Sequence, residues 1–104
     1  MSTYNIQITE PAEEDLYEIG VYISKELLEP ETAKKVISKI AKEINSLADM
    51  PLRNALVVDE RLAYNGIRKI IVNNYIIFYV VNDESKTVTI IRVLYSRRDW
   101  LNLL

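Results

Sequence analysis

The sequence predicts one α+β domain, residues 1–104, with an antiparallel helix hairpin packed on one face of a mainly antiparallel four-stranded sheet. The expected element order is β-α-α-β-β-β. Two observations carry this prediction. Apolar residues recur at helical spacing through two adjacent stretches of the first half. The last third, Gly66 to Leu104, holds three apolar runs separated by two polar turns, which is typical of a strand meander.

The first half begins with a short strand and continues with two helices. Residues 4–9 alternate apolar and polar side chains, which indicates a half-buried strand. Thr9 can cap a first helix over about residues 11–28. Pro30 is suited to open a second helix over about residues 31–49. The short link between the helices predicts that they are antiparallel neighbours.

Three predicted strands follow one another in the last third of the chain, over about residues 67–72, 75–81 and 87–95. Asn73 and Asn74 form a two-residue hairpin signal, because Asn tolerates a positive φ. A polar segment, residues 82–86, forms a longer hairpin loop. Residues 52–65 give weaker signals, with an extended piece at 56–58 and a turn before Gly66.

Both faces of the predicted sheet are apolar. In the strand over 75–81, one face holds Tyr75, Ile77, Tyr79 and Val81, and the other holds Ile76, Phe78 and Val80. In the strand over 87–95, strict alternation places Ile91, Val93 and Tyr95 on one face and Val88, Ile90, Arg92 and Leu94 on the other. Two helices cover only one face. A loop, the C-terminal tail, a second copy or another protein must therefore shield the second face.

The composition excludes several classes of function. The chain contains no cysteine and no histidine, which removes disulfides, thiol nucleophiles and the commonest metal ligand. Only two glycines are present, so no glycine-rich phosphate loop exists. No run approaches the roughly 18 apolar residues of a membrane span, and the N-terminus does not resemble a secretory signal. We expect a cytoplasmic protein without cofactor or metal.

Charge is unevenly distributed along the chain. Residues 1–52 hold five lysines and ten acidic residues, a net charge of −5, whereas residues 53–104 hold eight basic and five acidic residues, a net charge of +3. All six arginines lie in the second half. Either helices and sheet rims simply use different residue types, or the second half carries a basic face for an anion or a protein. A pI near 5.2 argues against a dedicated, sequence-specific DNA-binding protein.

Catalytic patterns are scarce. Glu13, Glu14 and Asp15 lie where a helix dipole favours negative charge, and we interpret them as a solvated face. The residues that remain as candidates for binding anions or stabilising charge on RNA are Arg68, Arg92, Arg97, Arg98, Tyr75, Tyr79 and Tyr95. The alternative is structural: Arg92 forms a salt bridge near the sheet, and the tyrosines pack with their hydroxyls at its rim.

The chain resembles the RelE/ParE superfamily of type II toxin–antitoxin toxins over nearly all of its length. The matching pieces are Ala12 and Asp15-Leu16 after the first strand, Tyr22-Ile23, Gly66-Ile67-Arg68, the strand from Asn74 to Tyr79, and the closing run from Ile91 to Asp99. The resemblance implies a RelE-like fold and a toxin that a cognate antitoxin neutralises by wrapping it with an extended segment. RelE-type members are ribosome-dependent mRNA endonucleases, and ParE-type members poison DNA gyrase.

The chain is more similar to the ParE branch. The RelE pattern has an arginine where this chain has Ile76 and a tail tyrosine where it has Leu103 and Leu104. Arg97 fits the pattern and would be the catalytic residue of a nuclease. By the ParE analogy, the residues expected to contact the target or the antitoxin are Arg68, Tyr75, Tyr95, Arg97, Arg98 and Trp100.

Three functions therefore stay open at this point: a gyrase inhibitor, an endonuclease with a variant site, and a member that only binds an antitoxin-like partner. The variant nuclease site would comprise Arg68, Arg97 and either Tyr75 or Tyr79. The target is accordingly gyrase or the ribosome. Whether the free protein forms a homodimer through its sheet also stays open.

Overall fold

The computed structural model describes residues 3–104, and its element order confirms the predicted fold. The strands are β1 (Asn5–Ile8), β2 (Arg68–Val72), β3 (Tyr75–Asn82) and β4 (Thr87–Tyr95), and the helices are α1 (Glu10–Val21), α2 (Pro30–Ser46) and α3 (Glu60–Tyr64). A π-helical turn, Tyr22–Glu26, extends α1, and 3₁₀ turns occupy Pro51–Arg53 and Trp100–Asn102. None of the helices in the described part of the chain has the length and apolar character needed to cross a membrane.

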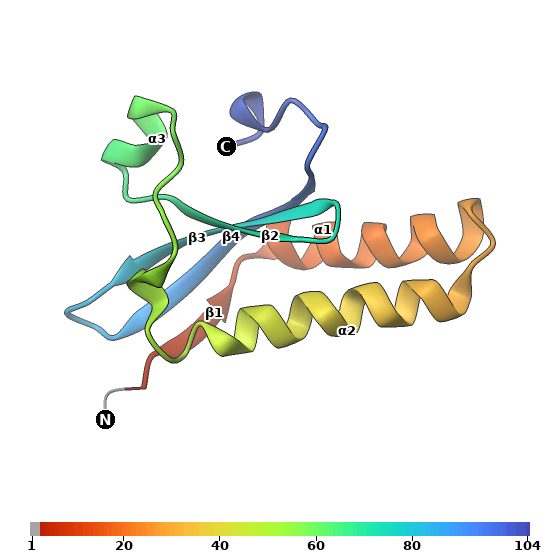
Figure 1. Ribbon diagram of the computed structural model, residues 1–104, viewed down its shortest axis with the longest axis horizontal. Coiled ribbons are helices and arrows are strands. Elements are labelled where there is room, and N and C mark those ends of the chain that lie inside the picture. The colour runs from red at the N-terminus through yellow and green to blue at the C-terminus, as the bar shows by residue number, and fades with distance from the viewer. Residues whose placement is uncertain (1–2) are drawn as a thin grey trace.

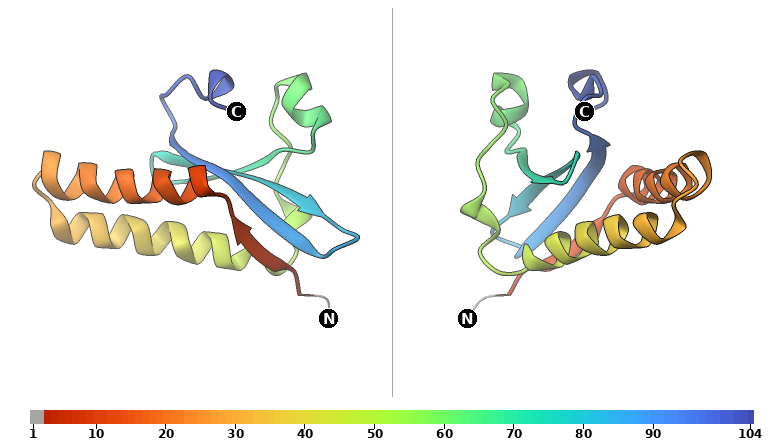
Figure 2. Two further views of the ribbon diagram at one scale, coloured as in Figure 1. Left: turned by 180° about the vertical axis from the view of Figure 1, so that it is seen from behind. Right: turned by 45° about the vertical axis from the view of Figure 1, so that its right-hand side comes forward.

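The sheet has the strand order β1-β4-β3-β2. β1 is parallel to β4, and the other two pairs are antiparallel. The helix hairpin α1–α2 lies on one face of the sheet and projects beyond its end (Figure 1). α3 and the C-terminal turn stand on the opposite face, as the views from behind and from the side also show (Figure 2).

The local signals in the sequence act as predicted. The Thr9 hydroxyl accepts a hydrogen bond from the Ala12 N–H at 3.2 Å and caps α1. Pro30 is the first residue of α2, where its missing N–H costs no intrahelical bond. Asn73 adopts a φ of +53° in the β2–β3 hairpin. The predicted single helix over 11–28 is divided, because its last part is the π turn.

The main core lies between the helix hairpin and the sheet. The helices contribute Ala12, Ile19, Ile23, Ala33, Ile40 and Ile44, and the strands contribute Val72, Ile77, Tyr79, Val88, Ile90 and Val93. The helix residues come from the two stretches with predicted helical spacing, and Ile77 and Tyr79 share a face as predicted, but Val93 was predicted on the face opposite Val88 and Ile90. The alternation predicted for β3 is confirmed on both faces of the sheet.

The alternation predicted for β4 is wrong beyond Ile90. Phe78 pairs with Arg92 and the next residue, Tyr79, pairs with Ile90, so Ile91 is an extra residue in a β-bulge. A bulge shifts the pattern by one position. The residues of β4 that pack in the helix-side core are Val88, Ile90 and Val93, and those that pack on the opposite side are Ile91 and Leu94.

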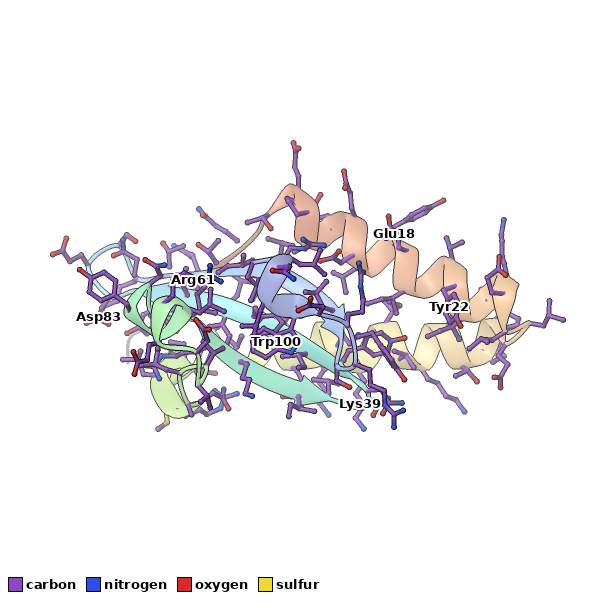
Figure 3. The ribbon with its side chains drawn as sticks, turned by 90° about the horizontal axis from the view of Figure 1, so that it is seen from above. Glu18, Tyr22, Lys39, Arg61, Asp83 and Trp100 are labelled. Carbon is purple, nitrogen blue, oxygen red and sulfur yellow. The ribbon has the colours of Figure 1, made fainter. Side chains whose placement is uncertain are left out.

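A second, smaller core covers the other face of the sheet. Its buried residues are Val57, Leu62, Ile67, Ile76, Phe78 and Leu94, and Trp100, Leu103 and Leu104 pack against them. Figure 3 shows Trp100 lying over the sheet on this side. Of the covers that the sequence left open, the chain's own loop and C-terminal tail are therefore the ones observed. The weak signals in residues 52–65 correspond to this covering loop, which includes α3.

A groove between the helix hairpin and the end of the sheet

A concave surface lies where the helix hairpin projects past the sheet. It is a groove of about 740 Å³, bounded by the end of α1, the π turn and the start of α2 on one side and by the start of β3 and the end of β4 on the other. Its apolar lining comes mainly from the helices: Ile19, Ile23, Leu27 and Val36. Ile19 and Ile23 are buried in the main core, whereas Leu27 is 48% exposed. The groove therefore extends from the edge of the main core to the exposed Leu27.

The π turn aligns Leu27 with this apolar floor. At about 3.6 residues per turn, two α-helical turns from Ile19 would end at Glu26. A π turn contains one more residue, and the Leu27 N–H bonds to the Tyr22 carbonyl at 3.1 Å, five residues back. Leu27 therefore lines the groove, and Glu26 is not among the lining residues.

Three tyrosines stand at the mouth of the groove. Tyr75 and Tyr95 are partners in the β3–β4 register, and their rings meet edge to face with centroids 5.8 Å apart. Tyr22 comes from the π turn and is 53% exposed. Burial raises the pKa of Tyr75, and the neighbouring Tyr95 and Tyr22 hydroxyls raise it further. The three rings present apolar faces with polar tips.

Among the predicted contact residues, four come together at this end of the molecule. Tyr75, Tyr95 and Arg98 line the groove, and Arg97 is the adjacent exposed residue. The Ser96 N–H bonds to the Asn74 carbonyl at 2.8 Å, which fixes the chain just before the two arginines. Within residues 3–104, no side-chain hydrogen bond or salt bridge engages Arg97 or Arg98. Both cations are therefore free to meet another molecule.

The other four arginines do not join a common basic face. Arg53 donates to the Asp49 carbonyl at 2.6 Å, and Arg61 donates to the Leu101 carbonyl at 3.4 Å. Arg68 donates to the Asn54 carbonyl at 2.6 Å and fastens the covering loop to β2. Arg92 pairs with Asp15. The arginine-rich second half of the sequence thus reflects mainly loop anchoring and one ion pair, and Arg68 is not close to Arg97 and Arg98 along the sheet.

Asp15 corrects the interpretation of the acidic cluster at the start of α1. Glu13 and Glu14 are exposed as expected, but Asp15 is only 6% exposed. It accepts two hydrogen bonds from the Arg92 guanidinium and one from the Val93 N–H. The sequence could not show this, because β1 ends at Ile8 and leaves that part of the β4 edge for α1 to cover.

Tyr79 lies away from the groove and has a structural role. Its hydroxyl donates to the Pro51 carbonyl at 2.7 Å and accepts from the Asn54 amide at 3.1 Å. Burial raises its pKa, while the Asn54 hydrogen bond and the nearby arginines lower it by less. Tyr79 is four residues from Tyr75 along β3, about 13 Å at strand spacing.

The residues of the variant nuclease site are consequently divided between two places. Arg68 is the cross-strand partner of Tyr79 at one end of the sheet. Tyr75 and Arg97 lie at the other end. Trp100 belongs to neither group, because its ring packs on Phe78 with centroids 5.1 Å apart and forms part of the second core. No group of three or more acidic side chains within residues 3–104 converges in a way that could hold a metal ion.

Sequence reasoning missed the helix wall of the groove. Glu18, Tyr22, Leu27 and Glu29 line it, and none of them was a predicted contact residue. One signal was available: Leu27 and Leu28 are consecutive apolar residues at a helix end, where only one of them can face the core. In the structure they are 48% and 80% exposed.

Comparison with known proteins identifies the family of the chain. The family model described as "ParE toxin of type II toxin-antitoxin system, parDE" matches residues 6–100. No curated protein matches the chain.

Several solved structures share the fold at low sequence identity. A chain of the chromosomal ParDE system from P. aeruginosa is 21% identical, with 91% of this chain and 98% of that chain covered and a TM-score of 0.73. A mutant of the E. coli toxin RelE in the free state is 17% identical, with 97% and 92% covered and a TM-score of 0.69. The intact E. coli RelBE toxin–antitoxin complex contains a chain that is 20% identical, with 91% and 99% covered and a TM-score of 0.63. Since the family model covers nearly the whole domain, the chain belongs to the ParE toxin family of type II toxin–antitoxin systems.

Proposed function

We propose that this toxin stops growth by binding DNA gyrase and that a cognate antitoxin neutralises it by occupying the groove. The observation that carries the proposal is the surface at the end of β4. There an apolar groove rimmed by tyrosines adjoins two unpaired arginines, Arg97 and Arg98. Aromatic residues and arginine dominate the binding energy of protein interfaces, so this surface suits a protein partner.

The division of the candidate nuclease residues supports the same choice. Chemistry on RNA needs charge-stabilising groups that converge on one reacting phosphate. Arg68 and Tyr79 are instead engaged by the covering loop, at the end of the sheet away from Arg97. The antitoxin part of the proposal is supported by the RelBE structure, in which a toxin of this fold is in complex with its antitoxin.

Growth and gyrase assays test the proposal together. Induced alone, the chain should arrest growth, and the purified protein should make gyrase accumulate cleaved DNA while messages on translating ribosomes stay intact. Arg97→Ala with Arg98→Ala should abolish both effects without unfolding the protein. Lys34→Ala with Lys35→Ala is the matched control, because it removes the same charge from an exposed face of α2 and should leave both effects unchanged.

Three results would overturn the gyrase proposal. One is the absence of any effect on gyrase at saturating protein. Another is discrete cleavage of ribosome-bound mRNA that depends on Arg97, which indicates the endonuclease. The third is normal growth on expression of the folded protein, which indicates a member that only binds its partner.

A further inference from the structure

We propose that the groove selects its occupant by charge: it takes a polypeptide segment that places a lysine or arginine against Glu18 and Glu29, beside an apolar side chain on the floor. This inference rests on the proposed function in assigning the groove to the antitoxin, and it adds the chemistry by which that partner is recognised. It follows from the charges of the lining residues.

The helix wall of the groove carries carboxylates without cations. Asp15 also lines this wall, but its charge is compensated by Arg92 at 2.7 Å. Glu18 and Glu29 are exposed, and neither takes part in a salt bridge within the described chain, residues 3–104. Glu29 accepts only a long hydrogen bond, 3.4 Å, from the Thr32 hydroxyl. Two carboxylates therefore remain available to an incoming cation.

The neighbouring aromatic ring favours a cation at the same place. Tyr22 is four residues after Glu18, so the two side chains lie on one face of the helix (Figure 3). An ammonium or guanidinium group over a tyrosine ring is attracted by the negative face of the ring. A basic side chain that pairs with Glu18 can lie along the ring of Tyr22 while its alkyl stem packs on the apolar floor.

The opposite wall gives the site a direction. Arg98 is the basic residue among those that line the groove, and it stands on the sheet side. An occupant in the reverse orientation would bring its cation towards Arg98 and away from Glu18 and Glu29. Like charges brought together at an interface are strongly unfavourable. The pattern therefore favours one orientation of the bound segment.

The shape of the groove favours a polypeptide over a small molecule. It is open to solvent and not enclosed, and its rim includes the exposed apolar surfaces of Tyr22, Leu27 and Tyr95. Sites for small molecules enclose most of the ligand. An open apolar groove with a charged rim is the arrangement that receives an amphipathic segment of another chain.

Selection from a random dodecapeptide display library tests the proposal without knowledge of the natural partner. The whole protein is the bait, and peptides that also bind the Leu27→Arg variant are discarded, since that arginine fills the groove. We expect the retained peptides to carry lysine or arginine next to a large apolar residue. The Glu18→Lys/Glu29→Lys variant should bind them about tenfold or more weakly, and repeated selection on that variant should enrich aspartate or glutamate.

Glu43→Lys with Glu84→Lys is the matched control. It makes the same change in net charge at two residues outside the groove, the half-buried Glu43 and the exposed Glu84, so it should leave peptide affinity and selection unchanged. Trp100 fluorescence checks that every variant is folded. The proposal is overturned by retained peptides without basic residues, by equal affinity for the two lysine variants, or by a lack of any groove-dependent peptide. Because no growth or gyrase assay enters this test, its failure is separable from failure of the proposed function.

Discussion

Asp15 on α1 and Arg92 on β4 form a two-pronged ion pair, with Nε–Oδ2 and Nη2–Oδ1 distances of 2.7 and 2.8 Å. The Val93 N–H also donates to Asp15 Oδ2 at 3.0 Å, and Arg92 Nη1 donates to the Leu103 carbonyl at 3.3 Å. The Asp15 hydrogen bond is the main cause that raises the pKa of Arg92. One pair of side chains therefore connects the helix hairpin, the open edge of β4 and the C-terminal tail.

We expect a substitution of either Asp15 or Arg92 alone to destabilise the fold strongly. Asp15→Asn leaves the guanidinium without its charge partner, and Arg92→Met leaves a buried carboxylate alone, at a cost of about 3 kcal/mol in each case. The double variant should lose clearly less than the sum, because it leaves no unpaired charge. Urea unfolding, monitored by Trp100 fluorescence, measures the stability of the two single variants and of the double variant. An exposed pair serves as the reference: Glu31→Gln, which breaks the contact with Lys34, should cost less than about 1 kcal/mol. Additive effects of the two single changes would contradict the coupling.

Tyr79→Phe should lower stability and change its dependence on alkaline pH. The substitution removes the hydrogen bonds to Pro51 and Asn54, a loss of about 1–3 kcal/mol at neutral pH. Because folding raises the pKa of Tyr79, its contribution is fully present below the unfolded pKa of about 10 and is lost as the pH rises through the folded value. The variant should therefore lose less stability between pH 9 and 11, a range set by that pKa of about 10. Urea midpoints at several pH values measure this difference, and an unchanged pH profile would contradict it.

The sequence predicted the fold well where local pattern and end signals agree. Thr9, Pro30 and the Asn73-Asn74 pair each act within a few residues of their own position, so their effects could be inferred directly. The bulge at Ile91 could not, because it is defined only by the partner strand opposite. Asp15 was misjudged for a similar reason: its burial depends on how short β1 is relative to β4.

The groove itself was not predicted. Tyr75, Tyr95 and Arg98 were expected contact residues by the family resemblance, and strand register and chain order place them at the groove. Glu18 and Glu29 were not, because the groove arises from the offset between the helix hairpin and the sheet. That offset is a tertiary property with no local signal. Trp100 is a residue that the sequence suggested for a contact surface, because of its aromatic character, but that the structure places in the second core.

Leu28 is held in an unfavourable backbone conformation at the tip of the hairpin. Its φ is +55°, and the Glu29 N–H bonds to the Ile23 carbonyl at 3.0 Å, six residues back. A left-handed residue directly after a helix end is usually glycine. A left-handed conformation costs an L-residue about 1–2 kcal/mol. We expect Leu28→Gly to be about 1 kcal/mol more stable than Leu28→Ala, which keeps the strain and removes the same exposed side chain. Thermal unfolding compares the two, and a less stable glycine variant would show that the strain is absent.

The last prediction concerns the π turn. Lys25 is an exposed residue of this turn, and its deletion should convert the turn into regular α-helix. Leu27 then lies seven residues from Ile19, about two α-helical turns, so it should keep its place on the groove floor. We expect the deletion to preserve the fold and peptide binding and to gain about 1 kcal/mol, which for a domain of this size raises Tm by about 4–8 °C.

Deletion of Lys35 from α2 is the matched control for this experiment. Lys35 is equally exposed, but it lies in regular α-helix, so its removal should rotate the following apolar stripe away from the sheet by about a quarter of a turn. That deletion should unfold the protein, because Ile40 and Ile44 leave the core. Comparable losses of Tm in the two deletions would mean that the π turn is not an insertion in the helix. A folded Lys25 deletion that no longer binds the groove-selected peptides would mean that the turn, and not only Leu27, shapes the site.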